Sequence, residues 1–385
     1  MLLLSLQGAP VSGAPASEPV VRLRRGAVKV FSAPRRGAPR RGLIGGPRAA
    51  FPLLEQVKAP GCAGPWYRIG PEAFVCSRRL RPGRGQPQGI RHPQLRRGRL
   101  MPGSYVVTRR RVVVRSGPAP TATAVRTLRE GSGLVLRQKI RNKQGLWRRT
   151  RRGYLPASDL RFVRPSSLAG VPLKAGSQLP VSWVNGATAW VTSRPTLNRQ
   201  ARVGGLKAYA RVEVLETQRV GARQFARIGP KRWVRADRIR TARLRAVPKG
   251  VGDQKWIHVS MRDWTMVAYQ GPRPVYAALI TRGYKTPKGS FRVTRKLAMA
   301  TLRFQTPSGE YEAEGVPWVV YFKPHYAFHS AYWHDSFGDR ASHGCVNLSP
   351  IDARWLFEWV APTLPPGWYQ IHSTSKHPGT FVLIE

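Results

Sequence analysis

Short aromatic and aliphatic runs alternate with turn residues along most of the chain. Residues 66–80 and 225–239 both show an aromatic residue, a spacer and Arg-Ile-Gly-Pro, and then an aromatic residue followed by Val. Residues 146–160 carry a looser copy of this pattern. Each copy predicts a short strand, a Gly turn and a second short strand that ends in a tight turn. The sequence therefore predicts a mostly β protein with an internal repeat in its first two thirds.

One stretch near the C-terminus has helical spacing instead. Ser349 suits an N-cap, Pro350 suits the first helical position, and Asp352 suits the first turn. The apolar positions that follow share one helical face: Ile351, Trp355, Leu356 and Trp359. No apolar run approaches the ~20 residues that span a bilayer, so the sequence predicts no membrane-spanning segment.

Charge divides the chain into two parts. Its 385 residues include 66 Lys and Arg against 18 Asp and Glu, and the hydrophobic fraction of 42% is that of a globular protein. The first 254 residues carry a net charge of +43, whereas 255–385 carry +5 and seven of the eight histidines. This contrast predicts electrostatic attachment in the first part and chemistry in the second.

The basic surface must attract a polyanion, but charge alone does not choose which one. Nucleic acid, the carboxylates of peptidoglycan stem peptides and outer-membrane lipid head groups are all candidates. No zinc-finger, helix-turn-helix or aromatic RNA-binding signature accompanies the charge, which argues against nucleic acid. The choice between these candidates depends on the chemistry predicted for residues 255–385.

One cysteine lies just before the first copy of the repeat and another lies within it. Cys62 and Cys76 lie in a segment that reads as two paired strands, and a disulfide across them would indicate an oxidising compartment. The alternative is two small buried residues in a reduced protein. We predict the disulfide, because the third cysteine has a separate explanation.

That third cysteine, Cys345, lies among histidines. His343 is two residues before it, His329 is sixteen before it, and His334 lies between them. An adjacent imidazole can take the thiol proton and later return it to a leaving amine. Gly344 lets a substrate approach closely, and the Gly344–Cys345 amides could donate to an oxyanion. A zinc site and a buried structural cysteine are the alternatives, but no metal-ligand spacing recurs, so we predict no metal and no cofactor.

The segment 342–347, Ser-His-Gly-Cys-Val-Asn, resembles the signature of the L,D-transpeptidase (YkuD-type) catalytic domain. The spacer 332–338, the stretches 255–261 and 264–270, and the Thr-Pro-Lys-Gly-Ser-Phe run at 286–291 are similar to further motifs of that family, in the same order. The match covers roughly 254–374. The upstream repeats resemble bacterial Src-homology-3-like barrels, which often accompany enzymes of the cell wall.

The resemblance implies a β-sandwich catalytic domain preceded by small β-barrel-like modules. It implies that Cys345 attacks the amide between diaminopimelate and the terminal D-Ala of a peptidoglycan stem peptide. D-Ala leaves, and an amine takes the acyl group from the thioester. By this resemblance, His329 holds the position of the residue that accepts and donates the proton. The motif around the nucleophile also includes Ser342, His343 and Gly344. The backbone carbonyl of Ser330 would orient the imidazole of His329.

The resemblance also bears on substrate contacts. Asn347 would position the substrate or the loop. Ser330 stands where the family often has a Gly after the first histidine of the motif. For Tyr332 and Trp333, on the loop over the nucleophile, contact and packing are equally favoured. Tyr321 lies in an apolar run and reads as core, and His334 reads as a loop-ordering residue.

The predicted organisation runs from a leader or partial signal segment to a C-terminal tail or last strand. Its parts are the leader 1–18, the first basic β module 19–82, a linker 83–102, the second module 103–165, the third module 176–247, the catalytic domain 254–374 and the tail 375–385. We expect a periplasmic or envelope location. An L,D-carboxypeptidase, with water in place of the amine, and a non-catalytic basic envelope binder remain as alternatives.

Overall fold

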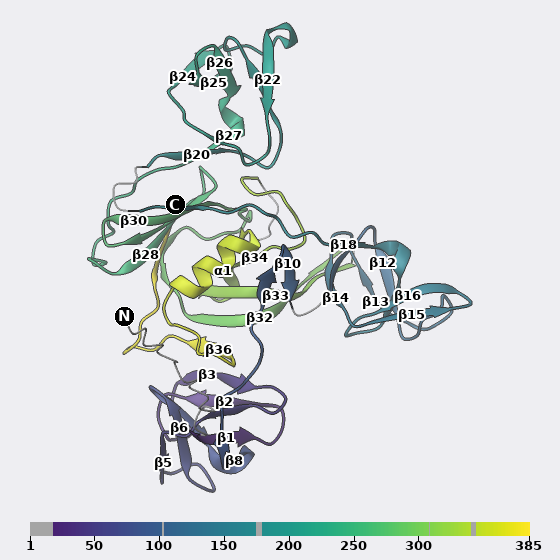
Figure 1. Cartoon of the computed structure of the whole chain (residues 1–385), viewed down its shortest axis with the longest axis vertical. Helices are drawn as coiled ribbons and strands as arrows, with labels where there is room; N and C mark the ends of the chain where they lie inside the picture. Colours follow the sequence, from purple (N-terminus) through teal and green to yellow (C-terminus); the bar gives the residue numbers. More distant parts are fainter. Residues whose placement is uncertain (1–17, 102–103, 175–178, 308, 340–343) are drawn as a thin grey trace, which may run out of the picture. The chain divides into compact units, whose positions relative to one another are not determined.

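The computed structural model describes residues 18–101, 104–174, 179–307, 309–339 and 344–385 (Figure 1). The chain forms two compact units, one of residues 1–91 with 365–369 and the other of 92–364 with 370–385. Strands dominate both units, and the prediction of a mostly β protein is confirmed. Among the described residues, no helix is long and apolar enough to cross a membrane.

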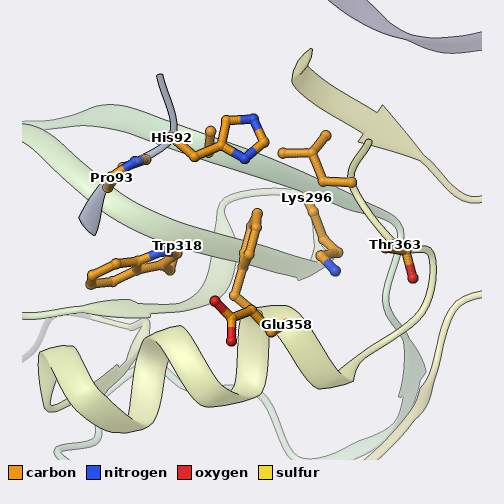
Figure 2. A pocket seen from close by; sticks show the side chains of 9 residues that line it. His92, Pro93, Lys296, Trp318, Glu358 and Thr363 are labelled. Atoms are coloured by element: carbon orange, nitrogen blue, oxygen red, sulfur yellow. The ribbon is translucent and has the colours of Figure 1, made fainter. Parts of the chain in front are cut away.

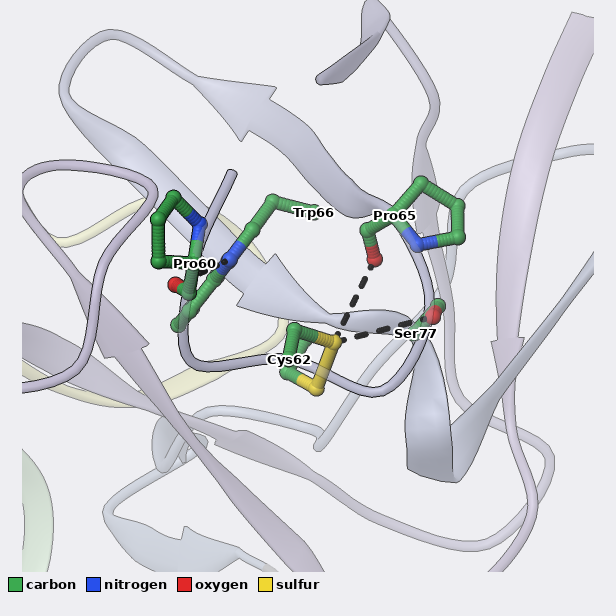
Figure 3. The surroundings of a disulfide bond; sticks show 6 residues. Pro60, Cys62, Pro65, Trp66 and Ser77 are labelled. Atoms are coloured by element: carbon green, nitrogen blue, oxygen red, sulfur yellow. Dashed lines mark hydrogen bonds between the residues drawn. A yellow bond between two sulfur atoms is a disulfide. The ribbon is translucent and has the colours of Figure 1, made fainter. Parts of the chain in front are cut away.

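The first unit is built from short antiparallel strands. β1 (Glu18–Leu23) pairs with β4 (Ala50–Pro52) and β8 (Leu80–Gly85). The remaining strands pair as β2–β3, β5–β6–β7 and β2–β7; they are β2 (Ala27–Phe31), β3 (Arg40–Gly45), β5 (Glu55–Val57), β6 (Trp66–Gly70) and β7 (Ala73–Cys76). Cys62 and Cys76 are joined by a disulfide, and the Ser77 hydroxyl lies 3.8 Å from the Cys62 sulfur (Figure 3).

All three copies of the sequence repeat have the same succession of elements. In the first copy β6 and β7 form a hairpin, a 3-10 turn (Ser77–Arg79) follows, and β8 begins at once. The second copy repeats this order with β16 (Gly145–Arg149), β17 (Tyr154–Pro156), a 3-10 turn (Ala157–Asp159) and β18 (Leu160–Phe162). The third does so with β25 (Arg223–Gly229), β26 (Arg232–Arg235), a 3-10 turn (Ala236–Arg238) and β27 (Ile239–Ala242). The predicted hairpins are therefore confirmed.

The second and third modules each have a small apolar core. The second contains Val114, Leu128, Leu134 and Leu155, and its other strands are β11 (Ser104–Thr108), β12 (Val112–Arg115), β13 (Ala124–Leu128), β14 (Gly133–Leu136) and β15 (Gln138–Asn142). The third contains Val184, Ala189, Val191 and Val234. Its other strands are β20 (Val181–Val184), β21 (Ala189–Thr192), β22 (Arg202–Leu206), β23 (Arg211–Val212) and β24 (Glu216–Val220). A hairpin of β9 (Gln94–Arg96) and β10 (Arg99–Met101) precedes the second module.

The described residues of the C-terminal third contribute to two sheets and form one α-helix. One sheet has the order β19-β30-β29-β28-β37-β31. Its strands are β19 (Val171–Pro172), β28 (Lys255–Ser260), β29 (Thr265–Gln270), β30 (Arg273–Leu279), β31 (Gly289–Arg292) and β37 (Phe381–Ile384). β19 lies in the Pro/Gly-rich stretch after the second module, so part of that stretch is an edge strand of this sheet.

The other sheet carries the candidate site. β32 (Arg295–Thr306) and β33 (Gly309–Lys323) form a long hairpin, β34 (Tyr326–Ser330) adds to β33, and β35 (Val346–Leu348) pairs in parallel with β34. β36 (Trp368–His372) pairs with β32. The predicted helix is confirmed as α1 (Pro350–Trp359), which packs on β33 and β34, and the Ser349 hydroxyl accepts a hydrogen bond from the Asp352 amide at 3.1 Å.

Candidate active site

Cys345 lies immediately before β35, which pairs in parallel with β34. Residues paired across strands point to the same face, and in the parallel pair His329 lies opposite Asn347. Cys345 is two residues before Asn347, so it continues the face that carries His329. Strand pairing thus brings together two side chains that are sixteen residues apart in the chain.

Burial keeps the Cys345 thiol protonated in the free protein. The side chain is 7% exposed, and its sulfur lies 3.7 Å from the His325 carbonyl oxygen, to which the thiol donates. Loss of hydration disfavours the thiolate and raises the pKa of Cys345 to about 11, although a hydrogen bond with the Ala327 backbone lowers it in part. The thiol therefore needs a base at the moment of attack.

His329 can act as that base because burial also keeps it neutral. It is 2% exposed, and desolvation lowers its pKa to about 4. Its Nδ1 lies 3.0 Å from the Ser330 carbonyl, which can only accept, so Nδ1 carries the proton. Nε2 is then the unprotonated nitrogen and is available to accept a proton.

A second histidine positions the amide of Asn347. The Ser336 amide donates to Nδ1 of His334 at 3.2 Å. Nε2 of the same ring lies 3.0 Å from Nδ2 of the Asn347 side chain. Burial, together with the nearby His329, lowers the pKa of His334 to about 4, although Asp335 acts in the opposite direction. His334 thus orders Asn347 on the face that carries Cys345.

The backbone before the nucleophile is fixed by Thr286. Its hydroxyl donates to the Gly344 carbonyl at 2.8 Å and accepts from the Gly283 amide at 3.1 Å. A side chain at Gly344 would place its Cβ 3.0 Å from the Tyr326 ring, so the close approach favours glycine. Thr286 was not among the predicted site residues, although it opens the Thr-Pro-Lys-Gly motif that signals it.

The structure places the other predicted residues as follows. Ser342 and His343 lie outside the described residues. The Trp333 ring is half-buried with its centroid 5.7 Å from that of His329. Tyr332 is fully buried and its hydroxyl donates to the Glu314 carbonyl at 2.6 Å. Ser330 is also buried, so its backbone carbonyl rather than its side chain contacts His329.

A cavity of about 210 Å³ lies beside α1, away from these residues (Figure 2). Trp318 and Phe357 line it together with His92, Glu358 and the buried Lys296. None of the predicted site residues lines it. Within the described ranges, no three His, Cys, Asp or Glu residues are grouped so that they could hold a metal ion.

Comparison with known proteins adds the family of this region. Residues 254–384 match the YkuD family model, described as the L,D-transpeptidase catalytic domain. YciB of Bacillus subtilis (strain 168), which is named as an inferred L,D-transpeptidase, is 28% identical over 121 residues; these are 27% of this chain and 59% of the relative.

Solved structures with similarity to the chain include two L,D-transpeptidases. The NMR structure of the Enterococcus faecium catalytic domain is 24% identical with a TM-score of 0.27, covering 35% of this chain and 100% of that chain. L,D-transpeptidase 3 from Mycobacterium tuberculosis is 18% identical with a TM-score of 0.28, covering 40% and 73%. On the family match, residues 254–384 of this chain carry a YkuD L,D-transpeptidase catalytic domain.

Proposed function

We propose that the protein is a peptidoglycan L,D-transpeptidase with Cys345 as its nucleophile. The observation that carries this proposal is the placement of a buried free thiol and a neutral imidazole on one face of the β34–β35 pair, within a region that matches the YkuD family. All three cysteines lie in the described part of the chain, and the other two form the disulfide.

The proposed reaction starts from the two uncharged groups. The Cys345 proton passes to Nε2 of His329 as sulfur attacks the carbonyl carbon between diaminopimelate and D-Ala. The Gly344–Cys345 amides stabilise the oxyanion. His329 then returns the proton to the nitrogen of D-Ala, the C–N bond breaks, and an acyl thioester remains on sulfur. An amine attacks the thioester, forms a new amide and gives its proton, through His329, back to the thiol.

Other residues around the thiol would hold substrate and loop. Asn347 presents the free end of its amide, and Trp333 packs beside the imidazole. Ser330 and Gly344 set the backbone on either side, and Ser342 and His343 complete the motif. Tyr332 acts beneath the loop rather than on the substrate, because its hydroxyl is bound to Glu314.

The basic modules would hold the enzyme on anionic envelope polymers, in the periplasm or cell envelope. The first 254 residues hold 52 Lys and Arg but only 9 Asp and Glu, so their net charge is +43. The Cys62–Cys76 disulfide supports an oxidising compartment. Stem peptides are the substrate, and cell-wall cross-linking is the expected outcome.

The test is incubation with a purified diaminopimelate tetrapeptide, followed by mass spectrometry of enzyme and products. We expect free D-Ala, a tripeptide adduct on the enzyme and cross-linked peptides. Cys345→Ala should abolish all three while its circular dichroism and melting temperature stay close to those of the wild type. A tripeptide product without cross-links would instead establish the L,D-carboxypeptidase, and turnover by Cys345→Ala would refute the assignment of the nucleophile.

A further inference from the structure

A cationic side chain lies in the same row of the sheet as the candidate nucleophile. Arg295 of β32 is paired with Tyr321 of β33, and Tyr321 is paired with Ala327 of β34. Phe328 is paired with Val346 in the parallel pair, so the position beside Ala327 is Cys345. Because paired residues share a face, this row runs from Arg295 across Tyr321 and Ala327 to Cys345 on the face that also carries His329.

Tyr321 supports the guanidinium of Arg295. The guanidinium carbon lies 4.1 Å from the centroid of the Tyr321 ring, and both side chains are half-buried. Burial raises the pKa of Tyr321; Arg295 lowers it, and the nearby Cys345 raises it. Tyr321 thus lies between the cation and the candidate nucleophile in this row.

The charge of Arg295 is not neutralised by the protein. All 18 Asp and Glu residues lie in the described segments, and none forms an ion pair with Arg295. The contrast with Arg303, farther along the same strand, is clear, because Arg303 pairs with Glu310 and Glu312. A half-buried guanidinium without a carboxylate partner is well suited to binding one from a ligand.

We propose that Arg295, held on the Tyr321 ring, binds a carboxylate of the acyl-donor peptide. Strand spacing of ~4.8 Å and the length of an arginine side chain place the guanidinium roughly 7–10 Å from the sulfur of Cys345. In diaminopimelate five carbons separate the two carboxyl carbons, which is roughly 7 Å when the chain is extended. The free carboxylate at the far end of diaminopimelate therefore matches the distance and the charge of the site. The amidated form of the same group carries no charge and would not match.

This inference rests on the proposed function for the identity of the peptide, but the anion site itself can be tested without it. Cys345 is the free cysteine, so alkylation reports on its surroundings. Iodoacetate and iodoacetamide have the same shape and differ in charge. Arg295→Gln should lower the rate constant for iodoacetate, divided by that for iodoacetamide, roughly threefold or more. The reason is that a unit charge at this distance no longer attracts the anion.

Two variants are matched controls for this measurement. Arg292→Gln makes the same change at a guanidinium that lies over Phe381, outside the row, and should leave the ratio unchanged. Arg295→Lys keeps the charge and should retain most of the ratio. An unchanged ratio in Arg295→Gln, or an equal fall in Arg292→Gln, would overturn the anion site.

The second measurement compares tetrapeptides whose far diaminopimelate carboxyl group is free or amidated. The wild type should prefer the free acid, mainly through KM, and Arg295→Gln should lose that preference. Equal processing of both peptides by the wild type would overturn the proposed ligand, even if Arg295→Gln does not fold. If neither peptide reacts while the alkylation ratio falls as expected, the proposed function fails and the anion site stands.

Discussion

Burial sets the chemistry of individual residues at this site. Cys345 and His329 are both almost inaccessible, and the loss of hydration pushes their pKa values apart, to about 11 and about 4. Both groups are therefore neutral over the whole range between these values. A preformed thiolate–imidazolium pair is not the resting state, and the proton must move during attack.

The pH dependence of thiol reactivity follows from this. In the free protein the thiolate fraction, and with it the rate of alkylation by iodoacetamide, should rise about tenfold per pH unit from pH 7 to pH 9 without levelling. Stopped-time alkylation with mass detection measures this rate. A plateau beginning near neutral pH would show that an imidazolium already stabilises the thiolate.

The two buried histidines should differ in their effect on turnover. His329→Ala removes the base and should reduce turnover on the order of 10²–10⁴-fold. His334→Ala removes the contacts with Asn347 and the Ser336 amide but leaves the proposed base in place, so it should reduce turnover much less. Release of D-Ala by each variant is the measurement, and the opposite ranking would move the role of base to His334.

At the scale of elements, both ends of α1 are fixed by buried polar groups. At its start Asp352 accepts hydrogen bonds from the Tyr276 hydroxyl and the Gly170 amide, both at 2.7 Å. At its end Lys296 and Lys255 donate to the Val360 and Trp359 carbonyls, where cations complement the helix dipole. Lys296 is 1% exposed, and burial, with the neighbouring Lys255, lowers its pKa to about 7.

Lys296 should therefore make the stability of its unit depend on pH. Between about pH 7 and its ordinary value near 10.5, the unfolded chain binds a proton that the folded chain does not. The free energy of unfolding should rise with pH in this range, by at most about 1.4 kcal/mol per pH unit. Urea unfolding at several pH values should show a smaller slope for Lys296→Met. Lys323→Met, at the exposed end of β33, is the control, and an equal loss of slope in both variants would contradict the assignment.

At the scale of the whole molecule, residues of the second and third predicted modules contact the C-terminal third within the second unit. Arg126 of β13 forms ion pairs with Glu310 and Glu312 of β33. In the third module the Tyr209 hydroxyl donates to Asp335 at 3.0 Å and accepts from the Phe337 amide at 3.2 Å. These last contacts hold the loop that carries His334.

We expect Tyr209→Phe to weaken catalysis although it lies outside residues 254–384. The change keeps the ring, which packs near Phe337, and removes only the hydroxyl. Loss of two hydrogen bonds should loosen the loop and lower kcat several-fold, with a smaller effect on KM and on the melting temperature. Tyr154→Phe in the second module is the control. Equal activity of the two variants would show that the loop does not depend on the third module.

Attachment to the wall should be electrostatic. Exposed charges are screened beyond ~8 Å at physiological ionic strength, so binding to isolated peptidoglycan sacculi should fall steeply as salt is added. Replacing Arg149, Arg151 and Arg152 with Gln should weaken binding, whereas replacement with Lys should not. Binding that does not respond to salt, or a preference for DNA at matched salt, would assign the modules a different role.

Local signals in the sequence were sufficient to predict the hairpins and the helix, and they mark Cys345 as the candidate nucleophile. The turns after Arg-Ile-Gly-Pro place Glu72 and Lys231 at positive φ, and the flanking alternation predicts the strands. Ser349 and Asp352 define the start of α1 within four residues. The motif around Cys345 predicts a thiol nucleophile, and the resemblance to the family predicts His329 as its base.

Tertiary structure alone decided what surrounds that chemistry. Arg295 and Tyr321 lie 50 and 24 residues before Cys345, and only the register of β32, β33 and β34 puts them in its row. Burial of Lys296, contact of Tyr209 with Asp335, and the membership of β19 in the catalytic sheet likewise join distant segments. Short-range patterns record turns, caps and motifs because their causes lie within a few residues. Register, burial and the electrostatic environment arise from contacts between segments far apart in the chain, so no local pattern encodes them.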